Sequence, residues 1–211
     1  MSKQVQKTHY DFGRYSYPGR FASYHYQVKE VLAQKPESVL EVGVGDQVFG
    51  HYVRDHVGVA YTSVDIAEDL QPDVVGSVTA LPCKDATYDV VCCFEVLEHI
   101  PYEQVPSAVR ELTRVAKKAV VISVPHFGPR TQFFLKLPFL PEMRCALKIP
   151  WPRSHKFNGE HYWELGKKGY TAKAFRELLA RYGTVTRDFV PFENQYHHFY
   201  TLTKSSAEKE K

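Results

Sequence analysis

The chain has 211 residues, of which 44% are apolar and 24% are charged, an ordinary balance for one globular domain. This composition excludes a disordered or fibrous chain. No stretch approaches the roughly 18 consecutive apolar residues of a membrane span. The net charge of +3 implies no DNA partner. We therefore expect a single domain over residues 1–211.

The cysteines and the first residues bear on the compartment. The four cysteines are Cys83, Cys92, Cys93 and Cys145, and they form no Cys-x-x-Cys pair, so neither a zinc knuckle nor a disulfide framework is predicted. Cys92 and Cys93 are neighbours in an apolar run and should face opposite sides of a strand. The first residues lack the apolar core of a secretory signal. These features favour a reducing, cytoplasmic location.

Strands and helices alternate along most of the chain. The predicted elements, in chain order, are helix 21–34, strand 38–44, helix 47–56, strands 59–66, 73–78 and 88–94, helix 102–116, strand 118–124, helix 171–182 with Thr171 as N-cap, and strands 184–192 and 196–203. Such alternation predicts an α/β fold with a doubly wound, mostly parallel seven-stranded sheet covered by helices on both faces. The closing strand pair predicts an antiparallel strand added at one edge.

Three segments stand outside this alternation. Seven of the first 26 residues are aromatic, so that segment should pack on the body of the protein, either as a strap or as a flap over the site. The charged tail 204–211 should be disordered. Residues 127–168 form a long insertion that is too apolar for a linker and carries eight lysines and arginines against three glutamates, a net charge of +5. We expect a lid there, with an amphipathic helix covering the pocket.

A glycine loop follows the first predicted strand. The segment Glu41-Val42-Gly43-Val44-Gly45 ends a buried run, and glycines at the carboxyl end of a parallel strand let the backbone approach a ligand closely. Asp65 ends the next strand 20 residues after Gly45, where a carboxylate can accept both hydroxyls of a ribose. Val48 occupies the position of the third glycine of the dinucleotide fingerprint, which disfavours NAD.

Together with later motifs, this pattern resembles the class I S-adenosylmethionine-dependent methyltransferases, in particular their small-molecule, methyltransferase-11-like subfamily. The resemblance spans residues 38–125, with a looser one from 171 onward. Its most specific part is the run Phe94-Glu95-Val96-Leu97-Glu98-His99-Ile100 after the fourth strand. The resemblance implies a Rossmann-like methyltransferase fold, S-adenosyl-L-methionine as cofactor, and a cofactor site made of Glu41, Gly43, Gly45, Asp65, Ile66, Ser77, Val78, Phe94 and His99. Arg20 would meet the cofactor carboxylate.

Two positions depart from the family pattern. Ser77 stands where the family usually has an acidic residue for the adenine amino group, and Gln47 stands at the family's third glycine. They leave open an alternative, a catalytically silent S-adenosylmethionine-binding protein that regulates a partner. A further alternative is an RNA or protein methyltransferase.

The methyl acceptor should enter near the carboxyl ends of the strands. His126 follows the fifth strand, and Glu160 and His161 lie in a run of polar and aromatic residues at the end of the insertion, so these three are the candidate acceptor-side residues for general acid–base work. No metal site is predicted, since His197 and His198 are strand neighbours that point apart. The basic insertion favours a small, anionic or sugar-like acceptor, with RNA or a membrane surface as weaker alternatives.

Overall fold

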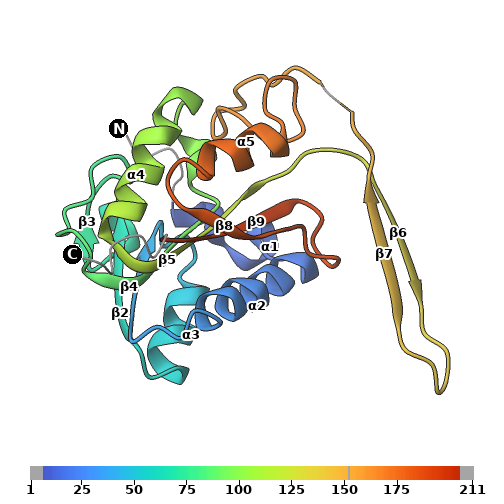
Figure 1. The fold of residues 1–211 in the computed structure, drawn as a ribbon, viewed down its shortest axis with the longest axis horizontal. Helices are drawn as coiled ribbons and strands as arrows, with labels where there is room; N and C mark the ends of the chain where they lie inside the picture. The colour runs from blue at the N-terminus through green and yellow to red at the C-terminus, as the bar shows by residue number, and fades with distance from the viewer. Residues whose placement is uncertain (1–6, 152, 205–211) are drawn as a thin grey trace, which may run out of the picture.

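Seven strands form one sheet in the computed structural model, which describes residues 7–151 and 153–204 (Figure 1). In chain order they are β1 (Ser38–Val42), β2 (Ala60–Asp65), β3 (Val74–Val75), β4 (Tyr88–Phe94), β5 (Ala116–Pro125), β8 (Thr184–Phe189) and β9 (His197–Thr203). Their order across the sheet is β3-β2-β1-β4-β5-β9-β8, and the first five pair in parallel. The predicted doubly wound, mostly parallel sheet is confirmed. Strand order reverses between β1 and β4, which is where such sheets bind ligands.

The helices cover both faces of this sheet (Figure 1). They are α1 (Phe12–Tyr15), α2 (Pro18–Leu32), α3 (Val48–His56), α4 (Val105–Val115) and α5 (Ala172–Leu179), with 3-10 turns η1 (Lys7–Tyr10), η2 (Glu68–Leu70), η3 (Leu97–His99) and η4 (Tyr102–Gln104). The Thr171 side chain accepts a hydrogen bond from the Ala174 N–H at 3.1 Å, so the predicted N-cap of α5 is confirmed. Because η4 precedes α4, the predicted helix 102–116 is shorter than expected.

Each face of the sheet has its own core. Val31 of α2 and Phe49 and Val53 of α3 pack with Cys92 on one face, whereas the apolar stripes of α4 and α5 pack with Cys93 on the other. The two cysteines are both fully buried and lie on opposite faces, as predicted from the period of two along a strand. A strand that is apolar on both sides needs cover on both sides, and this requirement explains the two helical layers.

The antiparallel strand lies one place further in than predicted. It is β9, which pairs antiparallel with β5 on one side and with β8 on the other, so β8 is the edge strand. All residues of β9 except Thr203 are buried, while no residue of β8 is. A buried strand is stabilised most when it pairs with a neighbouring strand on each side. The less buried β8 is therefore the better edge strand.

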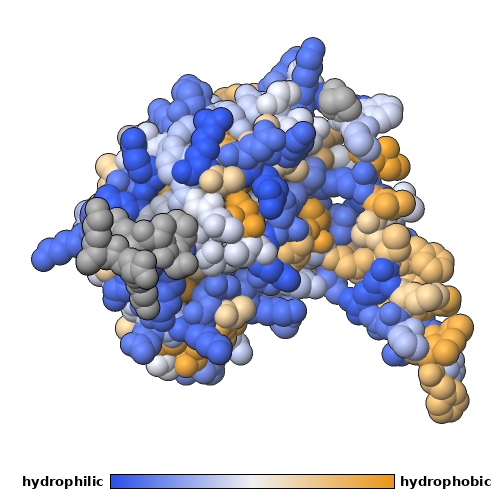
Figure 2. All heavy atoms as spheres, viewed as in Figure 1, coloured by the Kyte–Doolittle hydropathy of each residue, from blue (hydrophilic) through white to orange (hydrophobic). Residues whose placement is uncertain are grey.

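The insertion corrects the prediction of a helical lid. Residues 130–148 form an antiparallel hairpin of β6 (Arg130–Leu135) and β7 (Met143–Lys148), which extends away from the body of the protein (Figure 1). Many of its apolar side chains are exposed, and Figure 2 shows them as one hydrophobic stretch along the hairpin. The two strands pair in register from Arg130 with Lys148 to Leu135 with Met143, so backbone pairing between strands replaces the predicted helix. The hairpin does not cover the pocket described below.

Among residues 7–151 and 153–204, no helix is long and apolar enough to cross a membrane. The predicted disordered tail 204–211 lies outside the described residues except for Lys204.

Candidate functional site

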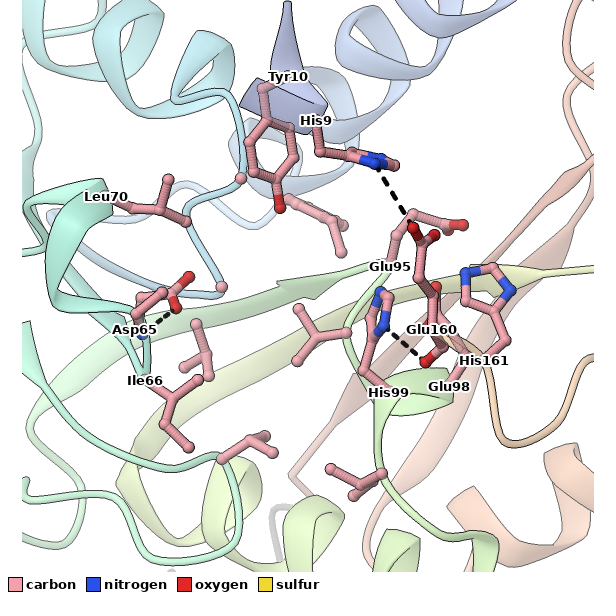
Figure 3. Close-up of a pocket in the computed structure, with 18 of the residues that line it drawn as sticks. His9, Tyr10, Asp65, Ile66, Leu70, Glu95, Glu98, His99, Glu160 and His161 are labelled. Atoms are coloured by element: carbon pink, nitrogen blue, oxygen red, sulfur yellow. Dashed lines mark hydrogen bonds and ion pairs between the residues drawn. The ribbon is translucent and has the colours of Figure 1, made fainter. Parts of the chain in front are cut away.

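A cavity of about 390 Å³ lies at the carboxyl ends of β1, β2 and β4. This edge of the sheet is the point where the strand order reverses, and the loops that leave the strands there diverge and open a crevice. The N-terminal segment lines the cavity from one side, with His9, Tyr10, Arg14, Tyr15, Tyr17 and Arg20. The aromatic segment therefore serves as a flap over the site, the second of the two roles expected for it. Figure 3 shows the lining side chains.

The loop after β1 requires its glycines. Gly43 has φ +88°, and a Cβ atom built there would lie 2.2 Å from Cγ2 of Val96, so no larger residue fits without movement of the chain. The Gly43 N–H donates to the Val64 carbonyl at 2.8 Å, which continues the pairing of β1 with β2. Gly45 has φ +49° and faces the ring of Tyr10. Both glycines line the cavity, where bare backbone is open to a ligand.

Asp65 lies at the end of β2 beside this loop. Its two carboxylate oxygens each accept one backbone hydrogen bond, from Val44 and from Ala67, both at 2.8 Å. Burial raises the pKa of Asp65, and the backbone N–H groups oppose that shift by stabilising the charged form. Each oxygen keeps lone pairs that can accept hydroxyl hydrogens.

Apolar residues form the wall next to Asp65. Ile66 and Val78 line the cavity with Leu70 and Phe94, and together they present a surface suited to the flat face of an aromatic ring. Ser77 also lines the cavity, and its Oγ lies 2.9 Å from Oγ1 of Thr79.

Two sequence-predicted residues lie outside the cavity. The Glu41 carboxylate accepts a hydrogen bond from the Tyr61 hydroxyl and lies beneath Gly50 of α3, because alternation along β1 directs it to the face opposite the helices α4 and α5. The His126 ring stacks on His198, with ring centroids 5.1 Å apart. Glu41 is thus buried outside the cavity, and His126 does not line it.

The departure at Gln47 has a structural solution. Gln47 adopts φ +64°, the left-handed conformation for which the family's glycine is suited. Its side-chain amide donates to the carbonyl of Leu70, and this contact offsets part of the strain.

The opposite end of the cavity is polar. Glu95, Glu98 and His99 follow β4, and Glu160 and His161 approach from the end of the insertion (Figure 3). The structure thus brings together the predicted residues His99, Glu160 and His161. Glu95 has φ +54°, an uncommon conformation for a non-glycine residue that is typical of functional sites.

Backbone contacts fix this meeting of distant segments. The Tyr162 N–H donates to the Glu98 carbonyl at 2.8 Å, and the His99 Nδ1 lies 3.0 Å from the Glu160 carbonyl. The indole N–H of the fully buried Trp163 donates to the carbonyls of Leu97 and Ile100, both at 3.1 Å. Residues 160–163 therefore run along η3 and cannot shift without breaking several hydrogen bonds.

Burial controls the charges of the polar end. It raises the pKa of Glu95 to about 7, while the nearby Arg20 opposes this shift. Burial also raises the pKa of Glu98, and the neighbouring Glu95 adds to the effect. Burial lowers the pKa of His99 to about 4, helped by His161, so His99 is neutral at pH 7. Burial would raise the pKa of Glu164, but the hydrogen bond and charge of His161 outweigh it, and the pKa is lowered.

Several lining residues were not predicted as site residues from the sequence. Glu95 and Glu98 belong to the motif after β4, and two carboxylates three residues apart were a visible signal. His9 and Tyr10 were hidden in the aromatic segment, because nothing local indicates which face of such a segment meets a site. Arg20 was predicted to contact the cofactor; its guanidinium lies 4.0 Å from the centre of the Tyr15 ring, and it lines the cavity.

The basic side chains of the hairpin do not reach the site. Among the described residues that line the cavity, none comes from 127–159. An anionic or sugar-like acceptor therefore stays a prediction.

Comparisons with known proteins give one family match. Residues 40–124 match the family model of a methyltransferase domain. No curated protein matches the sequence.

Solved structures resemble the whole chain. A protein from Pyrococcus horikoshii OT3 shares 13% identity, with 96% of this chain and 97% of that chain covered and a TM-score of 0.62. Magnesium protoporphyrin IX methyltransferase from Synechocystis PCC 6803, solved with bound S-adenosylhomocysteine, shares 18% identity over 97% and 90% of the two chains, with a TM-score of 0.56. The 1,6-didemethyltoxoflavin-N1-methyltransferase of Burkholderia thailandensis shares 15% identity over 90% and 92%, with a TM-score of 0.57. Identities this low show a common fold.

Proposed function

We propose that this chain is a class I S-adenosylmethionine-dependent methyltransferase that methylates a small-molecule acceptor bound at the polar end of the cavity, and the family-model match over residues 40–124 supports this. One observation carries the proposal: a single cavity joins the glycine loop and Asp65 at one end to the cluster of Glu95, Glu98, Glu160 and His161 at the other. A donor and an acceptor can therefore meet inside it.

The residues of the first end fit S-adenosylmethionine. Asp65 would hold the ribose hydroxyls, Ile66 and Val78 would enclose the adenine, and Gly43 and Gly45 give the backbone room that a Cβ atom would fill. The side chain of Arg20 supplies a cation for the methionine carboxylate, and its Nε is buried with no hydrogen-bond partner among the described residues. The bound cofactor supplies an electrophilic methyl group.

The protein's own part in the reaction is alignment and exclusion of water. Methyl transfer is an in-line displacement at carbon, so holding the acceptor atom in line with the methyl carbon supplies much of the rate. Tyr10 and Tyr15 of the N-terminal flap line the cavity. We propose that Glu160 and His161 orient the acceptor and that Glu160 receives its proton.

The charges at the polar end favour a neutral or cationic acceptor. Glu95, Glu98 and Glu160 line the cavity there, and a carboxylate such as that of Glu160 would repel an anion. An acceptor rich in hydroxyl or amino groups, such as a sugar-like molecule, would donate hydrogen bonds to these carboxylates. The solved Burkholderia relative holds a small molecule, 1,6-didemethyltoxoflavin, which supports this acceptor class.

Calorimetry followed by a search for the acceptor tests the proposal. We expect S-adenosylmethionine to bind with one site per chain, and we expect methyl-labelled donor to transfer label to neutral or cationic members of a small-molecule panel. Absence of S-adenosylmethionine binding would overturn the proposal. Binding without turnover on any acceptor class would favour the silent regulatory protein instead.

One observation favours a second candidate, an acceptor presented at an anionic membrane surface. The hairpin carries exposed apolar side chains, among them Phe133, Phe139 and Leu147, together with Arg130 and Lys136, and basic–apolar segments of this kind bind anionic lipid. Vesicles of phosphatidylserine and phosphatidylcholine would co-sediment with the wild-type protein and much less with Phe133→Ser/Phe139→Ser. Equal sedimentation of both proteins would show that the hairpin does not bind the vesicles.

We also propose a cytoplasmic location, which the four free cysteines support.

A further inference from the structure

We propose that Glu98, His99 and His161 bind one divalent transition-metal ion at the polar end of the cavity. The three side chains can each offer one ligand atom, and these atoms lie within 4.8 Å of one another. Metal–ligand distances of about 2.0–2.2 Å need only small side-chain rotations from that starting point. Two histidines and one carboxylate on one side of an ion form a ligand set for Fe²⁺, Mn²⁺, Co²⁺ or Zn²⁺.

The Glu98 carboxylate gives the strongest indication of a ligand. The residue is 1% exposed, and neither of its carboxylate oxygens has a hydrogen-bond partner among the described residues. An unpartnered buried carboxyl group costs free energy on the order of 1–3 kcal/mol or more. Figure 3 shows Glu98 beside His99 and His161, so a cation between them would satisfy both of its oxygens.

The two histidines are already oriented as metal ligands are. His99 Nδ1 lies 3.0 Å from the Glu160 carbonyl, and because a carbonyl only accepts, Nδ1 carries the proton. His161 Nδ1 lies 3.0 Å from the Glu164 carboxylate and is the donor there for the same reason. Both rings therefore keep a lone pair on Nε2. Metal-binding histidines are characteristically held in this way, by a carbonyl or a carboxylate on the other nitrogen.

Further contacts hold the three proposed ligands in place. Tyr196 donates its hydroxyl hydrogen to Glu164 Oε1 at 3.1 Å, so the carboxylate behind His161 is itself fixed. The rings of His99 and His161 meet edge to face with centroids 5.0 Å apart. Glu98 and His99 are neighbours in η3, and the Trp163 hydrogen bonds described above hold His161 against that turn. The ligands thus come from two rigid segments.

The local charge also calls for a cation. The carboxyl groups of Glu95, Glu98 and Glu164 lie close enough to interact with one another, and the charge of Arg20 acts on both Glu95 and Glu98. A divalent ion would offset charges that repel one another in a buried space.

An ion at this position would face the acceptor, which extends the methyltransferase function proposed above and depends on it. Three protein ligands leave coordination positions open toward the cavity. A hydroxyl oxygen of the acceptor can fill one of them, which lowers the pKa of that hydroxyl. Its proton passes to Glu160, the oxygen lone pair forms the new O–C bond, and the C–S bond breaks with its electrons left on sulfur. We therefore infer an oxygen acceptor.

Titration of the tag-free protein with Co²⁺, followed by visible absorption, tests the site. We expect one Co²⁺ per chain with the bands of a coordinated ion, and its removal by EDTA. Glu98→Gln and His161→Ala should each weaken Co²⁺ binding by at least about 100-fold, and Glu164→Gln, which disturbs only the orientation of His161, by about 10- to 100-fold. His126→Ala is the matched control: it removes a histidine of the stacked pair outside the cavity and should leave binding unchanged.

Calorimetry with S-adenosylmethionine on each variant separates this proposal from the previous one. Retained S-adenosylmethionine binding shows that the variants are folded. The metal site is overturned if the folded wild-type protein binds no Co²⁺, or if Glu98→Gln and His161→Ala bind it as the wild type does. Loss of S-adenosylmethionine binding in the wild type would instead overturn the methyltransferase function and leave the Co²⁺ result to stand by itself.

Discussion

The backbone N–H of Val44 donates a hydrogen bond to the carboxylate of Asp65 over 2.8 Å. This contact joins the glycine loop after β1 to the end of β2, so the residue that would hold the ribose also fixes the loop that would lie beneath the methionine. A second N–H, from Ala67, holds the other oxygen of Asp65 at the same distance. The carboxylate is therefore oriented before any ligand arrives, which lowers the entropic cost of binding.

Removal of the Asp65 carboxylate should weaken S-adenosylmethionine binding. We expect Asp65→Ala to cost about 1–3 kcal/mol of binding free energy, the scale of hydrogen bonds to a charged group. Asp65→Asn retains one oxygen acceptor and should lose less. Isothermal titration calorimetry measures both, and unchanged affinity in Asp65→Ala would remove Asp65 from the ribose site.

A methyl group at Gly43 should damage both stability and binding. The new Cβ atom would lie 2.2 Å from Cγ2 of Val96 at φ +88°, which adds about 1–3 kcal/mol of overpacking to about 1–2 kcal/mol of left-handed strain. Gly58→Ala is the matched control, because Gly58 has φ +73° with open space around it. Urea unfolding should show a larger loss for Gly43→Ala. Equal losses would mean that Val96 moves aside freely.

Arg20 should distinguish ligands with and without a carboxylate. We expect Arg20→Gln to weaken binding of S-adenosylhomocysteine by about 1.5–3 kcal/mol, the scale of a charged hydrogen bond. Binding of 5′-methylthioadenosine, which lacks the amino-acid carboxylate, should change little. Calorimetry with the two nucleosides gives the comparison, and parallel losses for both ligands would show that Arg20 acts on the shape of the cavity.

Glu41 should make stability depend on pH. Burial raises the pKa of Glu41 from 4.5 to about 8, although the Tyr61 hydrogen bond opposes this shift. Between these two values the unfolded chain releases its proton while the folded protein keeps it, so the free energy of unfolding falls as pH rises from 4.5 to 8. Each pKa unit corresponds to about 1.4 kcal/mol, and the total loss should reach a few kcal/mol.

Comparison with Glu41→Gln isolates this effect from the other titrating groups. Urea unfolding at several pH values should show the wild type losing stability relative to the variant as pH rises through this window. Curves that stay parallel across the window would show that Glu41 is ionised in the folded protein at every pH tested.

The local sequence was sufficient to predict those features that depend on a single strand, helix or loop. The apolar run of β4 predicted a buried parallel strand, and the glycine loop after β1 predicted the edge of the sheet where the cavity lies. Both predictions depend on local properties, the spacing of apolar residues and the conformational freedom of glycine. The spacing from Gly45 to Asp65 placed the carboxylate correctly, since one crossover to the neighbouring strand has a nearly constant length. The two-residue period of side chains along a strand likewise placed Cys92 and Cys93 on opposite faces of the sheet.

The tertiary structure decided what depends on contacts between distant segments. The sequence favoured a helical lid over residues 127–168, yet residues 130–148 form the outward hairpin β6–β7, because the choice between helix and strand for a short apolar run depends on the partner it finds. His126 follows β5 as predicted, but stacking on His198 directs it away from the cavity.

The amino-acid sequence by itself determined the doubly wound sheet and the end of the cavity formed by the glycine loop and Asp65, because hydrophobic period, glycine freedom and crossover length act over neighbouring residues. Only the folded chain brought His161 against Glu98 and His99. That meeting spans more than sixty positions of sequence and depends on the burial of Trp163, and burial is a property of the assembled core.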